Sequence, residues 1–149
     1  MRWIFMVLAG ALVIGGGGFM VYQNNKIPDH IGADDGDFAE MPSSPNAVSS
    51  QTDDSDKFVD PLPFKDDLAS SVDAMLGVLA QIPEITIERQ TDRYIHAVYT
   101  TSTMRFKNDI ELYFDEEEQL VHYRSESRVG HSDIGENREQ YKLIASRYE

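Results

Sequence analysis

An uninterrupted apolar run near the N-terminus constrains this chain more than any other sequence feature. Residues 3–22 read WIFMVLAGALVIGGGGFMVY and contain no charged side chain. A helix of 20 residues rises about 30 Å, which matches the hydrocarbon thickness of a bilayer. Glycines 15–18 lower the helix propensity in water, but unpaired backbone groups cost more in lipid. The run therefore predicts a membrane-spanning helix.

Two other interpretations of this run stay open, a cleaved signal peptide and a buried core helix. A signal peptide usually has an apolar run of about 7–15 residues and then a small-x-small cleavage site. No clear site of that kind follows here. Arg2 precedes the run, and Lys26 follows it just before a series of acids, which favours a cytoplasmic N-terminus. We predict a signal-anchor over residues 1–26 and a single-pass membrane localisation with an extracytoplasmic domain.

The charge and the absence of cysteine exclude several classes of function. A formal net charge of −13 repels nucleic acid, so no nucleic-acid partner is expected. Without cysteine there is no disulfide, no thiolate nucleophile and no cysteine-bound metal. The glycine run lies inside the apolar segment and is no phosphate-binding loop, so no cofactor is predicted.

Residues 27–41 differ sharply in composition from the apolar run. The sequence IPDHIGADDGDFAE combines low hydrophobicity with many acids, which is typical of a chain that does not order itself. We predict a flexible acidic linker here. Residues 42–149 then form one domain, because neither an internal repeat nor a second composition change interrupts them.

Hydrophobic periodicity predicts the secondary structure of this domain. Apolar residues recur at helical spacing over residues 66–81, and Pro83 ends that run. Alternating or β-rich segments follow, and a second amphipathic helix covers residues 137–148. The predicted strands are residues 84–89, 94–102, 109–114 and 120–127. The fold class is therefore α+β, a four-stranded antiparallel sheet with two helices on one face, preceded by a transmembrane helix and a flexible linker.

The segment RSESRVGHSDIGENR, residues 124–138, holds the densest group of polar side chains. As a ligand site, its arginines would bind an anion together with loop amides and a helix N-terminus. As a structural element, Arg128 would pair with Asp133, Gly130 and Gly135 would adopt positive φ, and Asp133 or Asn137 would cap the final helix. Both interpretations stay open. The candidate ligand-binding residues are Arg124, Ser125, Ser127, Arg128, His131, Asp133, Asn137 and Arg138.

The same segment contains the residue types of a hydrolytic triad. Ser125, Ser127, His131 and Asp133 could in principle supply a nucleophile, a base and an orienting acid. However, no Gly-x-Ser-x-Gly turn exposes either serine. His131 and Asp133 would give a metal only two ligands, and the spacing places no third one. We predict no catalytic residue and no metal site, and the question of enzymatic activity stays open, leaning towards no enzyme.

Several segments together resemble one known family. They are PSSPNAVSSQ (42–51), the D-PL-F pattern (60–64), TSTMRFKNDIELYF (101–114) and RSESRVGHSDIGENR (124–138). They resemble the family called domain of unknown function 1499, whose members are small membrane-anchored, secreted or plastid proteins. That family usually carries a cysteine on each side of Pro-x-x-Pro-Asn, where this chain has Met41 and Ala47. The resemblance implies no activity, and the missing cysteines argue against a redox role.

These observations favour a non-enzymatic envelope module that presents an Arg-rich loop to a protein partner or an anionic ligand. The expected membrane contact is through residues 3–22. Two alternatives are a hydrolase that uses residues 125–133 and an accessory subunit of a membrane complex.

Overall fold

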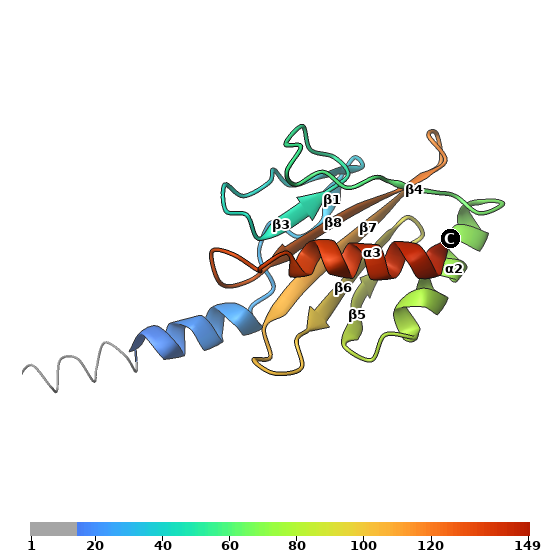
Figure 1. Ribbon diagram of the computed structural model, residues 1–149. Helices are drawn as coiled ribbons and strands as arrows, with labels where there is room; N and C mark the ends of the chain where they lie inside the picture. Colours follow the sequence, from blue (N-terminus) through green and yellow to red (C-terminus); the bar gives the residue numbers. More distant parts are fainter. Residues whose placement is uncertain (1–14) are drawn as a thin grey trace, which may run out of the picture.

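The computed structural model describes residues 15–149, and its main feature is a six-stranded antiparallel sheet (Figure 1). The strand order is β3-β8-β7-β6-β5, and β4 pairs with β8 along the same edge as β3. A separate small sheet contains β1 and β2. Residues 15–25 are helical. The other elements are β1 (Ala33–Asp34), β2 (Asp37–Phe38), β3 (Ala47–Ser49), β4 (Leu62–Pro63), α2 (Leu68–Ala80), β5 (Ile85–Gln90), β6 (Tyr94–Thr100), β7 (Lys107–Asp115), β8 (Leu120–Ser127) and α3 (Glu136–Tyr148).

Strand alternation gives the sheet two chemically different faces. In β7, Ile110, Leu112 and Phe114 point towards the helices and are fully buried. Asp109 and Glu111 alternate with them along the strand and therefore point to the other face. The β7–β8 register continues the pattern, because directly paired residues share a face.

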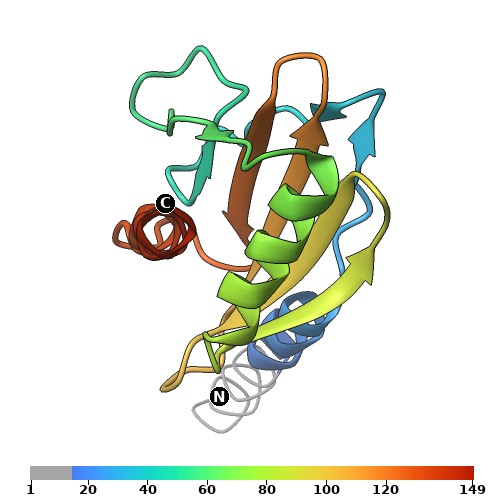
Figure 2. The same cartoon turned by 90° about the vertical axis from the view of Figure 1, so that its right-hand side faces the viewer.

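The two helices cover the apolar face and close the core (Figure 2). Helix α2 begins after Asp67, whose carboxylate accepts a hydrogen bond from the Ser70 amide at 2.7 Å. It buries Met75, Val78 and Leu79 against the sheet, whereas α3 buries mainly Ile144, Ala145 and Tyr148 among its apolar residues. Burial of this apolar surface is the main stabilising contribution to the fold.

The predicted four-stranded sheet is wrong in its number of strands. The four predicted segments correspond to β5–β8, but β3 and β4 extend the sheet beyond β8, and β1 and β2 form a second sheet. Of the four strands that the sequence did not predict, β3 is 3 residues long, and β1, β2 and β4 are 2 residues long each. Such short strands contain too few residues for period-two alternation to be visible.

The predicted membrane-spanning helix and single-pass membrane localisation are also contradicted. Across residues 15–149, no helix is both long enough and apolar enough to cross a membrane. The helical residues 15–25 end in the polar stretch QNN before the chain turns towards the sheet. Residues 3–14 of the predicted span lie outside the described residues.

Residues 27–41, predicted to be a flexible linker, instead pack on the polar side of the sheet (Figure 2). The amide of Gly32 donates to Oε1 of Glu111 at 2.7 Å, and the amide of Phe38 donates to Oε1 of Gln51 at 2.9 Å. These acceptors lie 79 and 13 residues away. Composition could not reveal them, because hydrogen bonds to distant side chains leave no hydrophobic pattern.

Candidate functional site

Ionisable side chains gather on the sheet face opposite the helices, here called the polar face. The strand register places Glu111 opposite Arg124, and Asp109 opposite Glu126. Most of these side chains are buried because residues 24–38 lie over this face. The polar face comprises Tyr94, His96, Asp109, Glu111, Arg124, Glu126 and Arg128.

Arg124 is held between two carboxylates and is only 1% exposed. Its Nη1 donates to Oε2 of Glu111 at 2.9 Å, and its Nη2 donates to Oε2 of Glu126 at 2.5 Å. The Tyr94 hydroxyl donates to Oε1 of Glu111 at 2.7 Å. Burial, followed by the nearby charge of Glu111, raises the pKa of Tyr94 far above its ordinary value, so the phenol keeps its proton. His30 completes the group, with Nε2 lying 3.0 Å from Oε2 of Glu126.

Arg128 forms a bidentate ion pair with Asp109. Its Nε and Nη2 donate to the two carboxylate oxygens at 2.7 Å each, while Nη1 donates to the carbonyl of Asn24 at 3.3 Å. Nε2 of the buried His96 lies 2.7 Å from Oδ1 of the same carboxylate. Burial alone would raise the pKa of Asp109, but the hydrogen bonds from Arg128 and His96 outweigh it and hold that pKa below the usual value.

This lowered pKa predicts a specific acid sensitivity. The stabilisation from ionised Asp109 is complete above its unfolded-state value of 3.8 and is lost as pH falls through the lower folded pKa. Asp109→Asn should therefore destabilise the protein most above pH 4, and the difference from wild type should shrink in stronger acid. Urea unfolding across this range measures the difference, with the exposed Asp92→Asn as control. A pH-independent difference would contradict the assignment.

Ser125, Ser127 and Asn137 lie on the helix side of the sheet and are buried. The Asn137 side-chain amide donates to Oγ of Ser127 and to the Asn46 carbonyl, both at 2.9 Å, and its oxygen accepts from the Ser125 hydroxyl. Oδ2 of Asp133 accepts from the backbone N–H of Asn137 at 2.8 Å, which satisfies a free donor in the first turn of α3. The N-cap residue of α3 is Gly135, so neither Asp133 nor Asn137 occupies the predicted cap position, although Asp133 still accepts from this first-turn amide.

The two remaining predicted site residues, His131 and Arg138, belong neither to the polar face nor to the Asn137 network. His131 is exposed, and within residues 15–149 no hydrogen bond joins it to Ser125, Ser127 or Asp133. The structure therefore does not assemble these side chains into a triad. Arg138 donates to two backbone carbonyls, of Phe58 at 2.9 Å and of Asp56 at 2.8 Å.

The loop before α3 is fixed by backbone conformation. Gly130 and Gly135 have φ values of 91° and 83°, as predicted for both glycines. The predicted ion pair between Arg128 and Asp133 is wrong, because Arg128 pairs with Asp109 instead. The strand pairing decides this outcome, since Asp109 and Arg128 lie on one face of the β7–β8 hairpin and Asp133 lies beyond it.

A cavity of about 300 Å³ lies between the N-terminal segment and this end of the polar face. Three carboxylates and two permanently charged bases line it, together with one histidine and several uncharged residues. The lining residues are Gln23, Lys26, Pro28, Asp29, His30, Ile31, Asp109, Glu126, Ser127 and Arg128. Among these lining residues the carboxylates outnumber the lysine and arginine by three to two, an arrangement that attracts cations.

Most of the polar face could not be found from residue patterns alone. Opposite charges at alternate positions in β7 and β8, such as Glu111 and Arg124, do indicate pairing once the hairpin is assumed. By contrast, His30 reaches Glu126 across 96 residues, and Gly32 reaches Glu111 across 79 residues. No local spacing encodes those two contacts.

The family comparison agrees with the resemblance noted from the motifs. The family model described as "Protein of unknown function (DUF1499)" matches residues 37–147. The chain belongs to this family. Comparisons with curated proteins and with solved structures gave no match. The cavity residues on the sheet lie inside the matched range, whereas residues 23–31 precede it.

Proposed function

We propose that this protein is a non-enzymatic binding module, and that the cavity between residues 23–31 and the polar face binds a small organic cation. The observation that carries the proposal is the excess of carboxylates around a polar cavity of about 300 Å³. This volume is at the lower end of the range for small-molecule sites. The ligand class follows from charge, because the wall favours a positive group.

The arginines argue against an anionic ligand at this position. Arg124 already forms ion pairs with Glu111 and Glu126, and Arg128 already forms one with Asp109. An anion would have to displace these buried carboxylates, which would leave them unpaired at a cost of several kcal/mol. The predicted Arg-rich anion site is therefore not proposed.

Glu126 is the residue that would contact the ligand. Its Oε2 already accepts from Arg124 and lies beside His30, but within residues 15–149 no hydrogen bond reaches its Oε1. The side chain is 18% exposed and lines the cavity. An ammonium group of the ligand could donate to this oxygen, and hydrogen bonds to charged groups contribute about 1.5–3 kcal/mol.

Isothermal titration calorimetry with putrescine as the probe tests this function. We expect saturable binding of one equivalent by wild-type protein and at least a roughly tenfold weaker affinity for Glu126→Gln, since about 1.4 kcal/mol corresponds to tenfold. The uncharged isostere 1,4-butanediol should not bind. The matched control Glu139→Gln removes an equal charge from an exposed position of α3 and should leave the affinity unchanged.

Three outcomes would contradict the proposal. Equal weakening by both variants would indicate general attraction to an acidic surface. Binding of inorganic phosphate in place of putrescine would restore the anion hypothesis. Binding of 1,4-butanediol as tightly as putrescine would show that the positive charge of the ligand does not contribute to the affinity. Circular dichroism melts of both variants show whether each remains folded at the titration temperature.

A further inference from the structure

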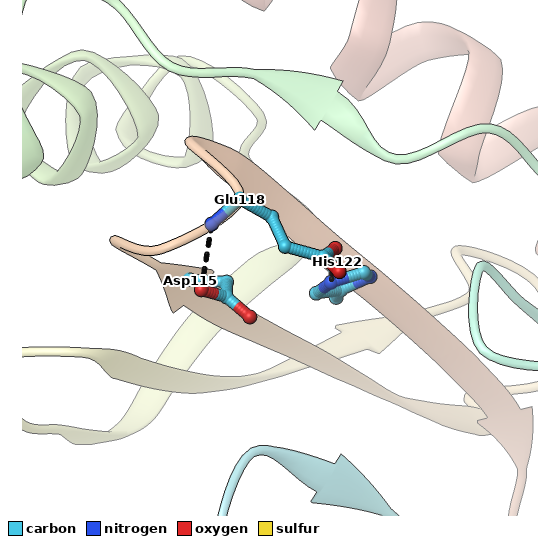
Figure 3. A group of neighbouring side chains, drawn as sticks. All are labelled: Asp115, Glu118 and His122. Atoms are coloured by element: carbon cyan, nitrogen blue, oxygen red, sulfur yellow. Dashed lines mark hydrogen bonds and ion pairs between the residues drawn. The ribbon is translucent and has the colours of Figure 1, made fainter.

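Three metal-binding side chain types meet at the β7–β8 turn, at the opposite end of the hairpin from the cavity (Figure 3). Asp115 is the last residue of β7, Glu118 lies in the turn, and His122 is in β8. One ligand atom from each side chain lies within 4.8 Å of the others. The turn thus brings two carboxylates and one imidazole together without any contribution from distant segments.

The turn itself is fixed by Asp115. Its Oδ1 accepts hydrogen bonds from the Glu117 amide at 2.8 Å and the Glu118 amide at 3.1 Å. No hydrogen bond within residues 15–149 reaches Oδ2, which is therefore available to a ligand. Figure 3 shows the Glu118 carboxylate beside the His122 ring, with the Asp115 carboxylate below the turn.

His122 is the most buried of the three side chains, at 11% exposed. Its Nδ1 lies 3.2 Å from Oγ of Ser50, which also accepts from the Tyr123 amide at 2.9 Å. Its Nε2 faces Glu118 Oε2 across 3.5 Å, an ion-pair contact that is too long for a good hydrogen bond (Figure 3). One nitrogen is thus positioned by a polar neighbour while the other faces the carboxylates, as in metal-binding histidines.

We propose that Asp115, Glu118 and His122 bind a divalent first-row transition metal of the Zn²⁺ type. Imidazole nitrogen combined with carboxylate oxygen suits Zn²⁺, whereas Mg²⁺ and Ca²⁺ prefer oxygen ligands alone. The two carboxylates balance the charge of the ion. Three protein ligands leave a coordination position for water. This site is separate from the cavity and does not depend on the function proposed for it.

Calorimetric titration of tag-free, full-length protein with Zn²⁺ tests the site. We expect one equivalent to bind to wild type, and Glu118→Gln and His122→Gln each to weaken binding at least roughly tenfold, since even outer-shell partners of metal ligands are worth that much. Glu118 is 61% exposed, so its replacement should not disturb folding.

Two matched controls separate coordination from general attraction. Glu117→Gln removes the same charge from the same exposed turn, and His131→Gln removes an exposed imidazole. Each should change the Zn²⁺ affinity less than about twofold, as expected for residues that are no ligands. If either control weakens binding as much as its partner variant, or if wild type shows no saturable binding, the site is refuted.

Discussion

Replacing Arg124 by methionine should destabilise the protein by about 3–5 kcal/mol, the usual effect of removing one partner from a buried ion pair. Arg124 is 1% exposed and is bonded to Glu111, which is fully buried, and to Glu126. The substitution would leave both carboxylates without their cation. Methionine fills a similar volume, so the loss would reflect charge more than packing. Urea unfolding at pH 7 measures it.

A double variant identifies the cause of this loss. Adding Glu111→Gln to Arg124→Met removes one of the two unpaired carboxylate charges. The double variant should therefore lose less free energy of unfolding than the sum of the losses of the two single variants. Arg138→Met is the matched control. Among residues 15–149 that side chain donates only to the backbone carbonyls of Asp56 and Phe58, and its loss should cost about 1 kcal/mol or less. Strict additivity of Arg124→Met and Glu111→Gln would show that the buried pair is not coupled.

Asn137→Ala is the other substitution with a large expected effect. It would deprive the Ser125 hydroxyl, the Ser127 hydroxyl and the Asn46 carbonyl of a shared partner inside the fold. Each buried polar group left unsatisfied costs about 1–3 kcal/mol. We therefore expect at least about 3 kcal/mol of destabilisation in urea unfolding, together with loosening of the strand β3 that carries Ala47 next to Asn46.

Gln140→Met on the same helix is the control for this variant. Gln140 is 5% exposed, and neither polar atom of its side chain makes a hydrogen bond in the described structure. Removing an amide without partners should therefore be neutral or stabilising. If both substitutions destabilise the protein equally, the loss arises from helix packing and the Asn137 network has no special role.

Hydrophobic spacing was sufficient for the central part of the fold. Ile110, Leu112 and Phe114 alternate over a long strand, and Pro83 marks the end of α2, so both elements are visible in the sequence. The edge strands are different, because Leu62 and Pro63 pair with β8 through backbone groups that any short segment could offer. Their positions follow from tertiary contacts rather than from a local pattern.

Strand alternation divides the predicted site residues between the two faces of the sheet. Arg124 and Ser125 are neighbours in sequence, yet strand alternation sends them to opposite faces of the sheet. The motif at residues 124–138 therefore contributes Arg124, Glu126 and Arg128 to the polar face, and Ser125, Ser127 and Asn137 to a hydrogen-bond network on the helix side. Residue spacing alone does not reveal the cluster of Asp115, Glu118 and His122, because its three side chains meet only when the turn brings the ends of β7 and β8 together.

An NMR titration of isotopically labelled protein with putrescine gives the most direct test of where a ligand binds. If the cavity is the binding site, the backbone amide signals of residues 23–31 and 126–128 should change in chemical shift together and reach saturation. The amide signals of residues 129–135 should not change. Saturable shifts centred on residues 129–135, or small unsaturated shifts spread over the acidic surface, would show that the cavity is not the binding site.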